Sequence, residues 1–146
     1  LWPQAAQARQ AFEEGMRCAD IIKVSEEEVA FLLGQENAAQ GAAELAKQYD
    51  ALVLASCGAR GALAANPSGL LGRAEALPVT VADTTGAGDA FLGTILAALA
   101  GKERAALHSM TEQEAVELLH LGCMAGSLTA SKLGAIPALP EKEELQ

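Results

Sequence analysis

Two spacings of apolar residues alternate along the chain. Short apolar runs predict strands, whereas apolar residues three and four positions apart predict helices. Asn66-Pro67-Ser68-Gly69 predicts a hairpin turn between two of the strands. The run from Ala51 to Ala55 is apolar throughout, as a strand buried on both faces requires. Strands are expected at Ile21–Val24, Ala51–Ala55, Ala62–Ala65, Leu70–Glu75 and around Val79 and Val81.

The first two helical stretches carry start and stop signals. Good helix formers fill Ala5 to Cys18, and Pro3 suits the start of that helix. Ser25 and Glu28 have the spacing of a capping box, and the apolar run behind them ends at Gly34, a common helix stop. These two segments therefore predict one helix on each side of the first strand.

The remaining helices follow the same logic. Asn37 can cap a helix that runs through Gln48. Apolar residues from Phe91 to Leu99 recur at helical spacing, and Lys102 to Ser109 is expected to be a linker. A second capping box, Thr111-x-x-Glu114, opens a final helix through Leu128. Strands interleaved with helices predict an α/β layered fold with a partly parallel sheet, in a single domain over residues 1–146.

Composition narrows the class of protein. The chain is 51% hydrophobic, which is typical of a globular protein, and its net charge of −9 argues against a nucleic-acid surface. The longest apolar run, Ala90 to Ala100, is too short to span a bilayer. The spacing of Cys18, Cys57 and Cys123 suits neither a metal nor a redox pair, so they are expected to be buried, reduced thiols in a cytoplasmic protein that binds no membrane.

The most informative stretch is VTVADTTGAGDAF, from Val79 to Phe91. It predicts a strand, a glycine-rich turn from Asp83 to Asp89 and then a helix. A helix start leaves backbone N–H groups free and favours negative charge, so this turn could hold a phosphate beside the carboxylate of Asp89. The string does not have the pattern of a P-loop. It is not a dinucleotide fingerprint either, because Phe91 stands where that motif has its third small residue. The alternative is an ordinary turn between a strand and a helix, in which Asp89 is only a solvated acid in the first helical turn.

DTTGAGDAF resembles the C-terminal signature of the ribokinase-like (PfkB) carbohydrate kinases. The resemblance implies a layered αβα fold, with ATP and Mg²⁺ as cofactors and a small-molecule sugar as substrate. It also implies that Gly86, Ala87 and Gly88 form an anion hole for the transferred phosphate and that Asp89 is the general base on the sugar hydroxyl.

Other segments resemble the same family in the same order. IIKVSEEE takes the place of its N-x-x-E motif, which implies a nucleotide role for Ser25 and a water-mediated link to Mg²⁺ for Glu28; the capping box is the alternative for both. Asp83 and Thr85 match half of a monovalent cation site that could hold K⁺, although Asp83 could simply stabilise its own turn. The remaining nucleotide-binding candidates are Ser56, Gly58, Arg60, Gly61, Gly88 and Cys123.

Arg60 and Gly61 illustrate the alternatives left open, because the same residues suit a tight turn with Gly61 at positive φ. Within the family the motifs are most similar to those of fructokinases, so phosphorylation of fructose is expected. Another sugar kinase of the family (for ribose, aminoimidazole riboside or ketodeoxygluconate) and a silent nucleotide-binding fragment are the alternatives. Members of the family are about twice as long, so the chain looks like a C-terminal half without the lid and N-terminal half. We expect it to be inactive alone and to form homo-oligomers.

Overall fold

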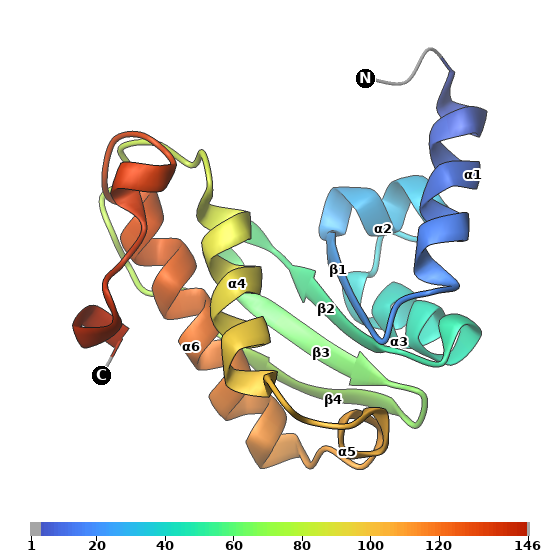
Figure 1. Cartoon of the computed structure of the whole chain (residues 1–146). Coiled ribbons are helices and arrows are strands. Elements are labelled where there is room, and N and C mark those ends of the chain that lie inside the picture. The colour runs from blue at the N-terminus through green and yellow to red at the C-terminus, as the bar shows by residue number, and fades with distance from the viewer. Residues whose placement is uncertain (1–3, 146) are drawn as a thin grey trace.

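The computed structural model describes residues 4–145 and has three layers, with a four-stranded sheet between two layers of helices (Figure 1). The strands lie in the order of the sequence. The first pair is parallel and the other two pairs are antiparallel, so the prediction of a partly parallel sheet is confirmed. The strands are β1 (Ile21–Ser25), β2 (Leu52–Ser56), β3 (Ala62–Asn66) and β4 (Gly69–Ala74).

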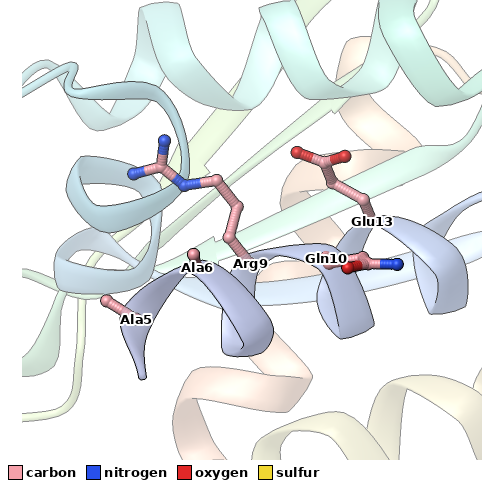
Figure 2. A pocket seen from close by; sticks show the side chains of 5 residues that line it. All are labelled: Ala5, Ala6, Arg9, Gln10 and Glu13. Atoms are coloured by element: carbon pink, nitrogen blue, oxygen red, sulfur yellow. The ribbon is translucent and has the colours of Figure 1, made fainter.

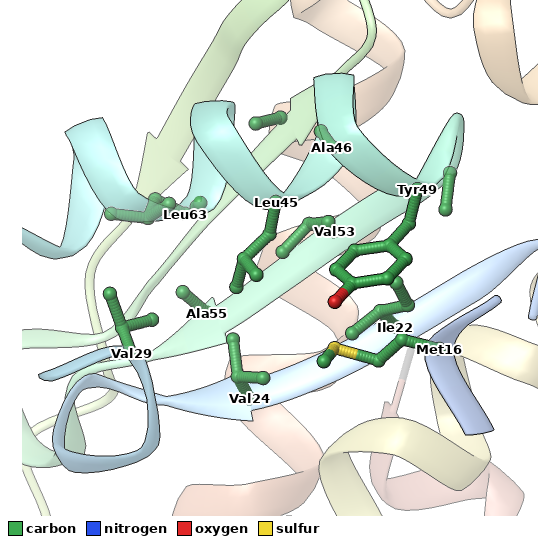
Figure 3. Packing of buried hydrophobic residues seen from close by; sticks show 13 residues of the cluster. Met16, Ile22, Val24, Val29, Leu45, Ala46, Tyr49, Val53, Ala55 and Leu63 are labelled. Atoms are coloured by element: carbon green, nitrogen blue, oxygen red, sulfur yellow. The ribbon is translucent and has the colours of Figure 1, made fainter. Parts of the chain in front are cut away.

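One face of the sheet packs against α1 (Ala5–Met16), α2 (Glu26–Leu33) and α3 (Ala38–Tyr49). Alternate residues of each strand point to this side, because successive side chains of a strand face opposite ways. Leu45 of α3 and Val53 of β2 are fully or almost fully buried there, as Figure 3 shows. The helix start predicted at Pro3 lies outside the described residues.

The opposite face packs against α4 (Ala87–Leu99) and α6 (Glu112–Ala130), with the short α5 (Arg104–His108) between them in the sequence. Phe91 and Ile95 of α4 meet Leu52 and Leu54 of β2 and Leu119 of α6 in this core. Because Leu52 and Leu54 alternate with Val53 on β2, both faces of that strand are buried, as its apolar run predicts.

Local signals in the sequence place the helix ends correctly. Both predicted capping boxes form, at Ser25 with Glu28 and at Thr111 with Glu114. The side chain of Asn37 accepts hydrogen bonds from the first turn of α3. Gly34 ends α2 in the left-handed conformation. Each of these features depends on residues close in sequence, which explains why the prediction succeeds.

The strand predicted around Val79 and Val81 is wrong. The segment between β4 and α4 has no regular structure, and the side chain of Val81 is 61% exposed. Pro78 has no N–H to donate to a sheet, and the backbone N–H of Ala82 donates instead to the carbonyl oxygen of Ala130 at the end of α6. The glycine-rich turn is therefore positioned by α6 and not by a preceding strand.

Two smaller predictions also need correction. The expected linker from Lys102 to Ser109 contains α5, whose Leu107 is buried in the core beneath α4. Of the three expected buried thiols, only Cys123 is buried, whereas Cys57 is half-buried and Cys18 is exposed. Among residues 4–145, no helix has both the length and the apolar character needed to cross a membrane.

Candidate active site

The turn that opens α4 leaves two backbone donors free. Gly86 is the N-cap residue and adopts a φ of 81°, which a glycine tolerates without strain. The N–H of Ala87 donates to the carbonyl oxygen of Thr84 over 3.2 Å. The N–H groups of Gly88 and Asp89 donate to no other residue of the described chain. Free N–H groups at a helix start attract anions, and the helix dipole adds to that attraction.

Asp89 lies in the first turn of α4, as its position in the sequence predicts. The residue is exposed, and its carboxylate makes neither a hydrogen bond nor an ion pair with residues 4–145. A carboxylate is thus available for a ligand directly beside the two free N–H groups. A base and an anion site at one helix start can together serve a reaction that removes a proton while negative charge moves.

Asp83 holds the turn together. Its Oδ1 accepts hydrogen bonds from the Thr85 backbone N–H over 2.9 Å and from the Thr85 hydroxyl over 2.7 Å. Its Oδ2 accepts a third from the N–H of Gly134 over 3.2 Å. These hydrogen bonds, with that from the Thr85 hydroxyl first, lower the pKa of Asp83 below its ordinary value. The carboxylate therefore stabilises its own turn and connects it to the loop after α6.

A cavity of about 520 Å³ lies against this helix start. Its walls come from the turn between β2 and β3, the irregular segment before α4, the start of α4 and the C-terminal half of α6. The residues of the cavity wall that the sequence singles out are Ser56, Gly58, Gly61, Ala87, Gly88 and Cys123. The cavity wall thus contains six of the thirteen predicted site residues. Those outside the wall are Ser25, Glu28, Arg60, Asp83, Thr85, Gly86 and Asp89.

Gly61 is required by the shape of the β2–β3 turn. Its φ is 88°, and a Cβ at this position would lie 1.9 Å from the carbonyl oxygen of Ala74. Only glycine allows such a close approach of two backbone segments. The prediction of a turn with Gly61 at positive φ is confirmed, and this turn forms one side of the cavity.

Cys123 of α6 faces the cavity from the opposite side. Its Sγ lies 4.0 Å from the carbonyl oxygen of Ala74, and burial raises the pKa of the thiol to about 11. The thiol is therefore protonated at neutral pH and serves as part of an apolar wall. Ser127, one turn further along α6, uses its hydroxyl to accept a hydrogen bond from the Leu77 N–H over 3.1 Å. This hydrogen bond fixes the irregular segment along the cavity.

The ends of β1 and β2 lie side by side, with Ser25 opposite Ser56 in the parallel register. The hydroxyl of Ser25 accepts a hydrogen bond from the Glu28 N–H, and the Ser25 N–H donates to Oε2 of Glu28 over 2.6 Å. The capping box thus uses one carboxylate oxygen of Glu28. The Ser56 hydroxyl donates to the carbonyl oxygen of Val24 over 3.4 Å, which ties the two strand ends together.

Arg60 projects from the β2–β3 turn toward the start of α2. Its guanidinium pairs with the carboxylate of Glu26. The arginine side chain is 72% exposed, so this is a surface ion pair that contributes little to stability. The pair holds the turn near the first residues of α2.

Lys23 is a residue that our reading of the sequence missed. It is the only charged residue of β1, and an ideal Cβ built on Gly88 would lie 3.6 Å from its Nζ. The ammonium group thus reaches the first turn of α4 from the sheet. A lysine in the middle of the apolar run IIKV was the available signal, because a charged side chain in a strand of this kind needs a reason.

Among the described residues, no cluster of three or more His, Cys, Asp or Glu side chains could hold a metal ion. Mg²⁺ usually keeps several waters and binds through one or two carboxylates together with substrate phosphates. The sparse set of carboxylates near the α4 start fits an ion that arrives with its phosphate ligands. It does not fit a resident metal held by protein alone.

A second hollow, of about 380 Å³, is lined by side chains of α1 (Figure 2). All of its lining residues belong to that one helix. Arg9 donates a hydrogen bond to the carbonyl oxygen of Phe31 over 2.7 Å, and its guanidinium stands 5.4 Å from the Phe31 ring. These contacts attach α1 to α2, and the hollow is separate from the α4 site.

Comparison with known proteins gives one family match and many relatives. The family model described as pfkB family carbohydrate kinase matches residues 1–142. The chain is 34% identical to a fructokinase of Klebsiella pneumoniae over 148 residues, which is 100% of this chain and 46% of that protein. The chain therefore spans about half the length of the curated relatives it matches.

Solved structures of sugar kinases are also similar to this chain. The crystal structure of a Vibrio cholerae fructokinase with fructose, ADP and calcium ion bound superposes with a TM-score of 0.80 and 30% identity, over 99% of this chain and 45% of that one. The aminoimidazole riboside kinase of Salmonella enterica, complexed with aminoimidazole riboside and an ATP analog, has a TM-score of 0.80 and 28% identity, over 99% and 46% of the two chains. Both likenesses extend over the α4 turn and the cavity.

Proposed function

The chain belongs to the pfkB family of carbohydrate kinases, and we propose that it forms the nucleotide-binding and catalytic part of an ATP-dependent sugar kinase. The observation that carries this proposal is the start of α4. There the free N–H groups of Gly88 and Asp89 and the free carboxylate of Asp89 lie beside a 520 Å³ cavity. This arrangement suits the transfer of a phosphoryl group from a nucleotide in the cavity to a hydroxyl next to Asp89.

In the proposed reaction a sugar hydroxyl oxygen attacks the γ-phosphorus of ATP. A new oxygen–phosphorus bond forms, and the bond from the γ-phosphorus to the bridging oxygen breaks. ADP leaves with that electron pair, and the hydroxyl proton passes to the carboxylate of Asp89. Asp89 can accept the proton because it is exposed and uninvolved in any other interaction of the described chain.

The anion hole would stabilise the charge on the transferred group. Phosphoryl transfer passes through a loose transition state, so positioned donors contribute more than covalent chemistry. Gly88 and Asp89 offer free N–H groups for this purpose, and Gly86 gives the turn its shape. The Ala87 N–H joins them when its 3.2 Å hydrogen bond to Thr84 opens.

The cavity would hold the nucleotide. The small residues Gly58 and Gly61 on one side and Cys123 on the other leave a slot with an apolar lining, suited to a flat base. Ser56 and Ser25 lie at the strand ends, where ligands of α/β sheets bind. Arg60 stands at the rim, where it could reach a phosphate after releasing Glu26.

Mg²⁺ would enter with ATP and neutralise charge on its phosphates. Glu28 could hold a water of that ion with its second carboxylate oxygen, since only Oε2 is used in the capping box. Asp83 and Thr85 could take part in a monovalent cation site such as one for K⁺. Their oxygen atoms already share hydrogen bonds, so a cation would have to compete with the contacts to Thr85 and Gly134.

Fructose is the proposed substrate, because the curated relative from Klebsiella pneumoniae is named fructokinase. Aminoimidazole riboside is the second candidate, because the kinase for that compound superposes equally well. Ribose and ketodeoxygluconate, the substrates of other kinases of the family, are the remaining candidates. A nucleotide-binding fragment without activity is the alternative of a different class, and a homo-oligomer is the proposed assembly.

The test uses the complete protein encoded by the parent reading frame. Release of ADP is measured in a coupled assay with each of these sugars. We expect turnover with fructose at ordinary kinase rates, about 1–100 s⁻¹, and none from the isolated 146-residue chain. Absence of sugar-dependent ADP release from the complete protein, with ATP binding retained, would favour the silent fragment and overturn the kinase proposal.

A further inference from the structure

Helices α4 and α6 approach each other closely at two glycines of α6. The two helices lie side by side and run in opposite directions, so the last turns of α6 lie against the first turn of α4 (Figure 1). Gly122 and Gly126 both face α4, because the atoms nearest to a Cβ built at either position belong to that helix. Gly126 also lines the cavity, so it lies at the junction of the cavity and the α4 start.

The two glycines face different parts of α4. A Cβ at Gly122 would lie 2.8 Å from the side chains of Phe91 and Ile95, which belong to the core. A Cβ at Gly126 would instead lie 3.2 Å from the backbone carbonyl oxygen of Ala87. Gly126 therefore faces the backbone of the turn that carries the free N–H groups, whereas Gly122 faces side chains further along the helix.

The carbonyl of Ala87 and the N–H of Gly88 belong to one planar peptide group. That N–H donates to no other residue of the described chain and is one of the donors proposed for the transferred phosphate. Because the peptide group moves as a unit, a contact that displaces its carbonyl oxygen also displaces or tilts its N–H. The room left at Gly126 thus decides where this donor points.

The same part of α6 fixes the segment that leads into the turn. The Ser127 hydroxyl accepts a hydrogen bond from the Leu77 N–H, and the carbonyl oxygen of Ala130 accepts one from the Ala82 N–H. Both contacts come from the stretch of α6 that directly follows Gly126. The C-terminal half of α6 is therefore the support against which the turn and the cavity wall are placed.

We propose that Gly126 is a positioning residue for phosphoryl transfer, because it lets the peptide between Ala87 and Gly88 lie where its N–H meets the transferred group. The inference rests on the function proposed above and adds α6 to the elements that shape the anion hole. Gly126 acts only through the α4 backbone. Alanine is more favourable than glycine inside a helix, so a glycine at this position gives up helix propensity for the close approach.

Two other roles of Gly126 lead to different expectations. If the glycine only allowed α4 and α6 to pack, a larger residue would lower stability without changing the reaction of the folded protein. If it only kept the cavity open, a larger residue would weaken the binding of every nucleotide complex by the same factor. Measurements of turnover, nucleotide binding and stability therefore separate the three roles.

The experiment compares Gly126→Ala, Gly122→Ala and Gly93→Ala in the complete protein. Gly126→Ala forces the Ala87 carbonyl to move by a few tenths of an ångström. We expect kcat to fall about 10-fold, since misplacement by about 1 Å can cost about 10²-fold. Gly122→Ala should lower the Tm through its clash with core side chains and leave kcat close to wild type. Gly93→Ala, on α4 with no atom within 4 Å of the new Cβ, should change neither.

Binding of ADP with aluminium fluoride, which mimics the phosphoryl group in transfer, gives a second measurement that does not need turnover. Gly126→Ala should weaken binding of this mimic by about the same factor as kcat, and binding of ADP alone much less.

Three results would overturn the inference while the kinase proposal stands. They are an unchanged kcat and mimic affinity in Gly126→Ala, an equal loss of affinity for ADP and for the mimic, and an equal loss of kcat in Gly122→Ala. If the wild-type protein releases no ADP with any sugar and does not bind the mimic, the proposed function fails and the inference with it.

Discussion

The backbone N–H of Gly134 lies 3.2 Å from Oδ2 of Asp83. The two residues are 51 positions apart in the sequence, and this hydrogen bond attaches the loop after α6 to the turn that opens α4. The same carboxylate orders the turn through Thr85. One side chain thus connects the anion-binding turn to the C-terminal loop, and its ionisation should control both.

The first prediction follows from the lowered pKa of Asp83. A carboxyl group whose pKa is lower in the folded than in the unfolded protein stabilises the fold. For Asp83 this stabilisation is fully present at pH above the ordinary pKa of 3.8, and it is lost as the pH falls through the lower pKa of the folded protein. Asp83→Asn should therefore lower the Tm at neutral pH, and the difference from wild type should shrink below pH 3.8. Thermal unfolding over this pH range measures it. Glu36→Gln, which removes an exposed carboxylate, is the matched control.

The second prediction concerns Asp89. Asn keeps the size of the side chain but is a far poorer base, so Asp89→Asn in the complete kinase should reduce kcat by roughly 10²–10⁴, as for other lost general bases. Stability and ATP affinity should change little, because the carboxylate is exposed and unpaired.

Asp83→Asn is the control for Asp89, since it removes a carboxylate six residues away that acts on the order of the turn. We expect it to cost less in kcat than Asp89→Asn. A kcat close to wild type in Asp89→Asn would mean that Asp89 is a solvated acid at a helix start, and the proposed reaction would lose its base.

The third prediction tests Arg60 against its partner Glu26. If Arg60 serves the nucleotide, Arg60→Ala should weaken ATP binding more than sugar binding, and the loss should be larger in a Glu26→Gln background, where Arg60 has no ion pair to release. The ion pair itself should contribute only about 0.2–1 kcal/mol to stability because it is exposed. Calorimetric titration with ATP measures the affinities. Unchanged ATP affinity in both backgrounds would assign Arg60 to the surface ion pair alone.

Some parts of the fold can be predicted from the sequence and others cannot. Caps and turns could be predicted because Ser25, Glu28, Asn37 and Gly61 act on residues near them in the chain. The conformation of residues 75–85 could not, because Val79 and Val81 have the composition of a strand. Their conformation depends on α6, because the carbonyl oxygen of Ala130 accepts hydrogen bonds from the backbone N–H groups of Ala82 and Asp83, which a sheet would otherwise use.

Only part of the candidate site could be predicted from the sequence as well. The turn from Gly86 to Asp89 is visible because a single segment carries it. The position of Lys23 beside the start of α4 is not, because it depends on which face of β1 packs against α4, and the sequence of β1 does not reveal the position of a helix that begins 62 residues after Ser25. Contacts between distant segments are what the structure adds.

The fourth prediction is a large loss of stability in Gly61→Ala. The new Cβ would lie 1.9 Å from the carbonyl oxygen of Ala74, and the φ of 88° with a ψ of −135° is strained for any other residue. Strain of this kind alone costs about 1–3 kcal/mol, and the clash adds to it. Chemical denaturation measures the free energy of unfolding. Gly15→Ala, on α1 with no atom within 4 Å of the new Cβ, should instead be neutral or stabilising by roughly 0.5–1 kcal/mol.

The last prediction is that the isolated 146-residue chain self-associates through β1. Within residues 4–145 this strand pairs only with β2, so its other edge has unpaired backbone groups. An open edge is a template for pairing with another chain, and relatives of about twice the length have further chain that could cover it. Sedimentation should therefore show dimers or larger species, and amide exchange in β1 should slow as they form.

The control for this last experiment is the loop after α6, where Leu133 is 77% and Ile136 is 81% exposed. These two side chains form the other candidate surface for association, because exposed apolar residues close together favour it. Changing both to Ser should leave the association intact if the β1 edge is responsible. A monomer in that double variant would assign the association to the loop, and a monodisperse monomer of the unchanged chain at high concentration would contradict the prediction altogether.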